Sequence, residues 1–284
     1  MGLVIFAALC VAGFAVIFRL FVRFGVALFP AITINYAVAF ACGLSLHPPW
    51  NVGDISLLWL PSALLGVLFV SIFSLQGLSA QRAGAARTTI AGRMSLVLTV
   101  LGIVLLFHER ITVLSISGIV IALVGLFLTV ASGDTRANKR SWMLPLLIFF
   151  GCGAADVIVN AVQRVRTTSL NEAAFTTMCF GGASTVSAIV LAVRGQRAAL
   201  THRRTWIGGI ALGIVNYASL LFLVLALGEG ALPASSIFPL MNIAAILFAT
   251  IAGVTLFNER LSVRQWIGIG CCVTALALIM SGAS

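Results

Sequence analysis

The sequence predicts an all-α polytopic membrane protein in which ten transmembrane helices form two inverted five-helix repeats. The first observation is composition, because hydrophobic residues make up 61 % of the 284 residues and charged residues only 8 %. Soluble domains carry about 25 % charged residues. The second observation is an internal repeat, since the motif Phe-x-Glu-Arg occurs at 107–110 and again at 257–260, each time between two apolar runs. No soluble core of this length hides so much apolar surface, so lipid is the expected solvent.

Ten stretches are long and apolar enough to span a bilayer, which takes about 20 residues as a helix. They fall at 2–23, 27–46, 57–80, 84–107, 112–131, 143–164, 172–193, 206–227, 231–256 and 262–281. The connections are short and hold most of the charge, so we expect neither a linker between independent domains nor an appended soluble domain. The first stretch lacks the basic start and the small-residue cleavage site of a signal peptide, and we interpret it as the first helix.

Cysteine usage and net charge narrow the expected partners. All six cysteines lie inside apolar stretches, and none has zinc-type spacing with histidine, so we expect buried thiols and neither a metal nor another cofactor. The net charge of +10 would suggest nucleic acid in a soluble protein. In a membrane protein, basic residues gather in cytoplasmic loops instead. The expected partners are therefore the lipid bilayer and a small-molecule substrate, and not nucleic acid.

The 17 basic residues also predict an orientation when the ten stretches are threaded alternately through a membrane. One side receives Arg19, Arg23, Arg82, Arg87, Arg136, Lys139, Arg140, Arg194, Arg197, Arg203, Arg204, Arg260 and Arg264. The other side receives only Arg110, Arg164 and Arg166, while Arg93 lies inside a span. The positive-inside rule then places the richer side in the cytoplasm and both termini outside. We predict a multi-pass protein of the bacterial cytoplasmic (inner) membrane.

The internal repeat predicts how the two halves are related. Each half contains five helices, and an odd number means that the second copy enters the membrane from the opposite side. We predict a first repeat at 1–132 and a second at 141–284, related by a pseudo-two-fold axis in the membrane plane. This architecture is typical of secondary transporters, whose substrate site lies near the midplane between the repeats.

The two repeated passages also carry a family resemblance. They are 105–112 with Gly118 and Gly125, and 256–262 with Gln265, Trp266 and Gly268. Together with the layout of the whole chain, they resemble the EamA-type branch of the drug/metabolite transporter superfamily. The resemblance implies export or exchange of amino acids and other small metabolites. It also implies a central cavity lined mainly by the first, third, fourth, sixth, eighth and ninth helices, and termini that usually lie in the cytoplasm, against the charge distribution here.

The motif itself contributes Glu109-Arg110 and Glu259-Arg260, which would lie on opposite faces of the membrane. Thr112 and Ser262 follow three residues after each glutamate and can cap the next helix, and Ser262 with Gln265 has the spacing of a capping box. We interpret the motif as a structural turn that closes each repeat. Direct substrate binding by the glutamates is the alternative.

Two ionisable residues lie well inside predicted spans. Arg93 is in the fourth stretch and Asp156 is in the sixth. A charge in the hydrocarbon costs about 2.5–3.5 kcal/mol even on a lenient insertion scale, so neither side chain should face lipid. The two either form a static ion pair that joins their helices or line a polar site at the midplane. We favour the site, because intramembrane charges usually mark function.

Other polar residues at similar depth are candidates for the same site. They are Asn160, Asn216, Tyr217, Ser235 and Asn242. A single polar residue in a span often only hydrogen-bonds a neighbouring helix, but as a group these side chains fit a cavity. Pro239 lies in the middle of the ninth stretch and predicts a kink there. Interrupted helices are typical of transporter sites.

The leading hypothesis is a secondary transporter that exports a small polar metabolite by alternating access. Arg93 would bind a carboxylate and Asp156 an ammonium group, which suits an amino acid or a related compound. In the alternative role, Asp156 carries a coupling proton. We expect a monomer or a weak homodimer, because small residues in the fifth and tenth stretches suit helix packing within one chain.

Three other functions are alternatives to this hypothesis. A multidrug or organic-cation exporter is less favoured, because the first stretch has no acidic residue. A flippase for a lipid-linked substrate stays open. An intramembrane enzyme is not expected, since the histidines lie at loops and neither an H-E-x-x-H nor a G-x-S-x-G motif occurs.

Overall fold

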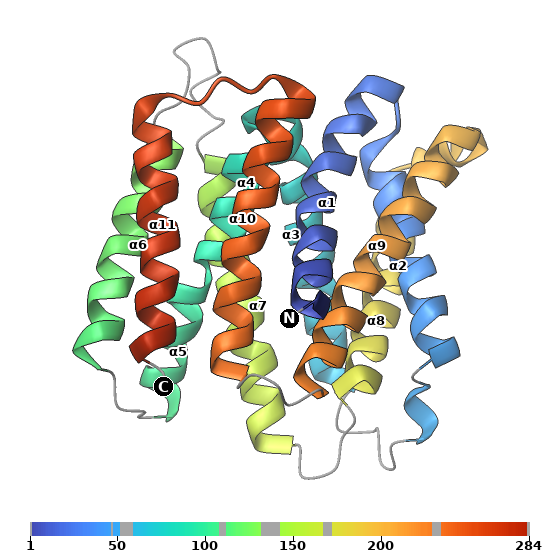
Figure 1. Cartoon of the computed structure of the whole chain (residues 1–284). Coiled ribbons are helices and arrows are strands. Elements are labelled where there is room, and N and C mark those ends of the chain that lie inside the picture. The colour runs from blue at the N-terminus through green and yellow to red at the C-terminus, as the bar shows by residue number, and fades with distance from the viewer. Residues whose placement is uncertain are drawn as a thin grey trace.

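Helices form the described part of the chain, as the computed structural model in Figure 1 shows. The structure describes residues 2–46, 48–51, 59–107, 112–131, 143–166, 172–228 and 234–282. The first helices are α1 (Gly2–Phe24), α2 (Leu28–Leu46), α3 (Trp59–Ala83), α4 (Ala85–Met94), α5 (Leu96–Phe107) and α6 (Val113–Ala131). The others are α7 (Met143–Arg166), α8 (Glu172–Val193), α9 (Arg203–Gly228), α10 (Ala234–Phe257) and α11 (Val263–Gly282). Short 3-10 turns lie at Pro49–Asn51 and Gln196–Thr201.

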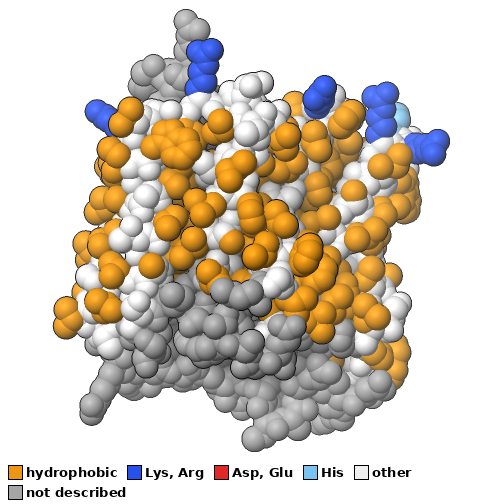
Figure 2. Space-filling view, viewed as in Figure 1, with side chains coloured by type: hydrophobic (Ala, Val, Ile, Leu, Met, Phe, Trp, Pro, Cys, Tyr) orange, Lys and Arg blue, Asp and Glu red, His pale blue; other side chains and the backbone are white. Residues whose placement is uncertain are grey.

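Several of these helices are long and apolar enough to cross a membrane. In the described residues, six pass this test: α1, α2, α3, and the segments Ala174–Val193, Arg203–Leu223 and Leu240–Phe257. Shorter apolar helices lie at Ile116–Thr129, Met143–Ile158 and Val263–Leu278. Large hydrophobic side chains are exposed on many of these helices, and Figure 2 shows them across the described part of one face. The chain is therefore an all-helical, multi-pass membrane protein.

The lysine and arginine side chains visible in Figure 2 gather at one end of the bundle, at the top of that view. We call it the basic end and define it by Arg19, Arg23, Arg82, Arg204 and Arg264. The ends of α1 and α3 meet there, because the Arg19 Nη1 donates to the carbonyl of Gln81 at 3.3 Å. The start of α9 joins them through a bond of 3.4 Å from the Arg204 Nη1 to the Phe24 carbonyl. The orientation of this end in a membrane stays a prediction.

The predicted single helix at 84–107 is wrong, because the chain is interrupted at Ser95, between α4 and α5. The Ser95 hydroxyl donates to the Gly92 carbonyl at 2.6 Å, which offers the backbone a partner outside the regular helix ladder. Gly92 also lowers the helix propensity of this turn. By contrast, α10 is helical across Pro239, whose side chain lies outside the described part, and a kink there stays a prediction.

Close packing of α6 against α11 forms one edge of the molecule (Figure 1). A Cβ atom on Gly125 would lie 2.8 Å from both the Cys272 Sγ and the Gly268 carbonyl oxygen. The two backbones therefore touch where their small residues face each other, as expected for small-residue helix contacts. The predicted use of these residues for packing within one chain agrees with this arrangement.

The remaining helices pack against one another in pairs. Helix α2 packs on α9 and α3 packs on α8, while α1 packs on α10 and α7 packs on α4 and α5. One apolar core centres on Ile90, Met94 and Ile148, and a second centres on Phe18 and Tyr36. Helix α4 contacts α10 between these cores, so its C-terminal end lies in the interior of the bundle.

Candidate functional site

Arg93 is placed in the last turn of α4, beside the interruption at Ser95. Its Nη1 donates to the Oδ1 of Asn242 at 3.3 Å, which joins α4 to α10 in the middle of the bundle. Asn242 is buried, and the Arg93 side chain is half-buried. A cation near a helix C-terminus is stabilised by the partial negative charge of the free carbonyls. The local sequence therefore supplies a place where the buried guanidinium is tolerated.

Asp156 lies opposite this interruption, on α7. Its Oδ2 accepts hydrogen bonds from the Ser95 hydroxyl at 3.4 Å and from the Thr99 hydroxyl at 3.3 Å. Both distances are long for a hydroxyl donor, for which about 2.7–2.8 Å is usual. Although neighbouring helices surround it, Asp156 keeps an exposed surface.

The two intramembrane charges are neighbours. Arg93 makes its hydrogen bond with the neutral amide of Asn242, and it lies two residues before Ser95, whose hydroxyl bonds Asp156. Three of the predicted site residues, Arg93, Asp156 and Asn242, thus come together from α4, α7 and α10. A guanidinium and a carboxylate close to each other can bind the two charged ends of a zwitterion.

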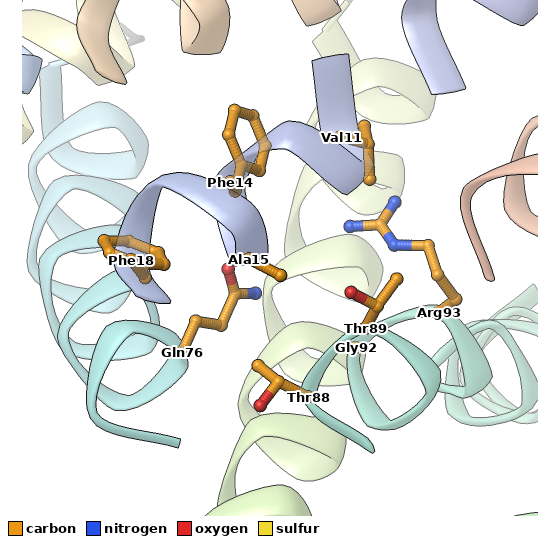
Figure 3. A pocket seen from close by; sticks show the side chains of 9 residues that line it. All are labelled: Val11, Phe14, Ala15, Phe18, Gln76, Thr88, Thr89, Gly92 and Arg93. Carbon is orange, nitrogen blue, oxygen red and sulfur yellow. The ribbon is translucent and has the colours of Figure 1, made fainter. Parts of the chain in front are cut away.

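A pocket adjoins this group between α1, α3 and α4 (Figure 3). It is lined by Val11, Phe14, Ala15, Phe18, Gln76, Thr88, Thr89, Gly92 and Arg93. The wall from α1 is apolar, while α3 and α4 contribute the polar groups and the charge. The Gln76 Nε2 donates to the Cys152 Sγ at 3.5 Å, which links this wall to α7. The lining of this pocket therefore combines a cationic end with an apolar side.

Sequence reasoning missed the polar wall of this pocket. Thr89 lies one helical turn before Arg93 on α4, so the spacing was a signal for it. Gln76 is a polar residue in a predicted span, but it lies near the end of the third stretch, which disfavoured it as a residue of a midplane site. Thr88 donates to the Ser79 hydroxyl at 2.8 Å, so part of its role is to join α4 to α3.

Asn216 and Tyr217, also predicted for the site, lie elsewhere. The Asn216 Nδ2 donates to the Oδ1 of the fully buried Asn35 at 3.1 Å, which joins α9 to α2. Tyr217 packs near Phe180, with their ring centroids 6.5 Å apart. Neither lines the pocket beside Arg93. Asn160 and Ser235 have side chains outside the described residues, so their role in the site stays a prediction.

Replacing Asn216 with leucine is expected to cost about 1 kcal/mol of stability, because the buried Asn35 loses its partner. The measurement is the midpoint of thermal unfolding in detergent. The double variant Asn35→Leu/Asn216→Leu should recover part of this loss, since both polar groups are then removed together. Equal stability of the single variant and the unmodified protein would contradict a structural role for this bond.

The second copy of the repeated motif lies at the turn between α10 and α11. Asn258 adopts a left-handed conformation with φ of 51°, which asparagine tolerates at a helix C-terminus. The predicted capping box is present, because the Ser262 N–H donates to the Gln265 Oε1 at 2.8 Å and the Gln265 N–H to the Ser262 Oγ at 3.4 Å. Arg260 is exposed. Glu109 and Arg110, in the first copy, lie outside the described residues.

Glu259 does more than end this turn. Its Oε1 accepts a hydrogen bond from the Ala85 N–H at 2.8 Å, at the start of α4, and forms an ion pair of 3.3 Å with the Arg19 Nη2 on α1. An anion at a helix N-terminus is stabilised by the free N–H groups there. The motif glutamate of the second half therefore binds two helices of the first half.

Arg93, Asp156 and Asn242 thus lie in a multi-pass helical bundle beside a pocket. The EamA-like transporter family matches residues 139–281, about half of the chain, and the chain belongs to this family. The resemblance stated from the repeated motif is thereby confirmed. The protein is a membrane transporter of the drug/metabolite transporter type.

Two further similarities span nearly the whole chain. An uncharacterized protein of Haemophilus influenzae is 28 % identical over 96 % of this chain and 95 % of its own. One crystal structure matches with a TM-score of 0.60 at 16 % identity, over 96 % of this chain and 97 % of its own. The second similarity supports the fold alone.

Proposed function

We propose that this transporter moves a small zwitterionic metabolite, an amino acid or a related compound, out of the cell by alternating access. The observation that carries the proposal is that Arg93 lines a pocket while Asp156 bonds Ser95, two residues beyond Arg93 in the chain. The membrane would be the bacterial cytoplasmic membrane, with the basic end in the cytoplasm. Asp156 takes the ammonium group in this proposal, and carriage of a coupling proton is its alternative role.

Alternating access in this proposal uses ten spans in two inverted repeats, at 1–132 and 141–284. Helix packing supports that relation. If α1 corresponds to α7, α2 to α8, α3 to α9, and α4 with α5 to α10, then the α2–α9 contact corresponds to the α3–α8 contact. The contact of α1 with α10 likewise corresponds to those of α7 with α4 and α5. Two halves packed in matching ways can rock about the site between them.

The chemistry of the pocket favours a zwitterion over an organic cation. A guanidinium gives a carboxylate two parallel hydrogen bonds, and Arg93 has further N–H groups besides the one bonded to Asn242. The same charge repels a cation that lacks an acidic group. The apolar wall of Val11, Phe14 and Phe18 can hold the uncharged part of the substrate.

A thermal-shift screen of the purified protein tests this proposal. Zwitterionic amino acids are expected to raise the unfolding midpoint, because a ligand that binds only the folded state stabilises it by about 2.7 kcal/mol at 100 times its Kd. Amines with the same side chain but no carboxylate should have no effect. Stabilisation by organic cations, with no zwitterion active, would contradict the proposal.

A further inference from the structure

Glu259 stands at the centre of a cluster at the basic end that joins both halves of the chain. Its carboxylate holds the Ala85 N–H of α4 and the guanidinium of Arg19 on α1. Arg19 in turn donates to the Gln81 carbonyl of α3 at 3.3 Å and lies over the ring of Phe257, 5.3 Å from its centroid. The end of α10 is thus tied to three helices of the first half.

Two glycines make room for this carboxylate. A Cβ atom on Gly84 would lie 2.9 Å from the Glu259 Oε2, and one on Gly253 would lie 2.7 Å from the same atom. Gly84 also has φ of 101°, a conformation that side chains rarely adopt. The carboxylate is therefore enclosed on both sides by backbone. This fit holds the start of α4 against the end of α10.

The cluster lies directly beyond the end of the pocket. Phe18 lines the pocket and precedes Arg19 on α1, and Thr88 lines it one turn into α4 from Ala85. Gln81 bonds back to the pocket wall, because its Nε2 donates to the Phe18 carbonyl at 3.3 Å. Movement of a ligand from Arg93 towards the basic end, between α1, α3 and α4, would therefore meet this cluster.

We propose that Glu259 and Arg19 form a latch that closes the basic end of the transport pathway in the state seen here. The inference rests on the alternating access proposed above and adds the contact that must break when this end opens. Breaking it separates the α10–α11 turn from α1 and from the start of α4.

Thiol labelling of the pocket tests the latch without a substrate. The reporter is Thr89→Cys in a chain whose six cysteines are replaced by alanine. A membrane-impermeant maleimide is added to inside-out and to right-side-out vesicles. In the otherwise unmodified chain, labelling from the side of the basic end should be slow. Glu259→Gln and Arg19→Gln should each raise the rate about tenfold from that side only, the order expected when a charged contact that stabilises one of two states is lost.

Arg23→Gln is the matched control, because Arg23 is exposed and lies one turn beyond Arg19 on the same helix. Its labelling rate should equal that of the unmodified chain. If Glu259→Gln fails to fold, Arg19→Gln carries the test, since it keeps the bond from Ala85. Unchanged labelling in the folded latch variants, or an equal rise from both sides, would overturn the latch. The assay uses no substrate, so its failure is distinct from a failure of zwitterion binding.

Discussion

Replacing Arg93 with alanine is expected to remove the stabilisation of the protein by its zwitterionic substrate and to stop transport. The guanidinium is the carboxylate-binding group of the proposed site, and a hydrogen bond to a charged group is worth about 1.5–3 kcal/mol. Two such bonds from one guanidinium correspond to a loss of affinity of about 100-fold or more. The measurements are the ligand-induced shift in unfolding midpoint and uptake into proteoliposomes, both with the amino acid identified by the screen.

The stability of the same variant without ligand separates a binding site from a static ion pair. Removing one partner of a buried ion pair costs about 3–5 kcal/mol, because the other charge is left uncompensated. A carboxylate that keeps an exposed surface, as Asp156 does, should cost far less when its partner is removed. We expect Arg93→Ala to unfold near the midpoint of the unmodified protein while losing its ligand response. A large fall in that midpoint would favour the ion pair instead.

Lysine at position 93 is the control for charge alone. It keeps the positive charge but lacks the planar pair of donors, so intermediate binding is expected. A full ligand response of Arg93→Ala would remove this residue from the site.

The sequence predicted structure best at positions where exposure of a polar or charged group to lipid has a high free-energy cost. Apolar runs located the helices because a span must bury its backbone polar groups internally. Arg93 and Asp156 were predicted to line a site because a charge in the hydrocarbon requires a partner or a cavity. Asn216 and Asn242 had the same appearance in the sequence, yet one bonds Asn35 and the other bonds Arg93. An amide is satisfied by either partner, so only the packing of the helices distinguishes the two roles.

Contacts between the halves were beyond sequence reasoning. Glu259 was interpreted as a turn residue, and its turn is present, but its carboxylate binds Ala85, 174 positions away. The sequence also did not predict the interruption at Ser95, because no proline marks it. The Ser95 hydroxyl bonds the Gly92 carbonyl and so competes with the regular helix, and hydrophobic periodicity does not reveal such a local bond.

The largest loss of stability is expected from valine at Gly268, in the contact between α6 and α11. A Cβ atom there would overlap the Thr129 side chain and would lie 2.8 Å from the Gly125 carbonyl oxygen. Because backbone cannot move aside as a flexible side chain can, the two helices must separate. Overpacking of this kind costs about 1–3 kcal/mol. Valine adds two methyl groups beyond the Cβ, so we expect the upper part of that range.

Gly270 provides the matched control on the same helix, since a Cβ atom there meets nothing within 4 Å. Gly270→Val should therefore unfold near the midpoint of the unmodified protein, whereas Gly268→Val should unfold several degrees lower, at about 2–4 °C per kcal/mol for a chain of this size. The measurement is thermal unfolding of both variants in the same detergent. Equal midpoints for the two variants would contradict a role of these small residues in the close packing of α6 against α11.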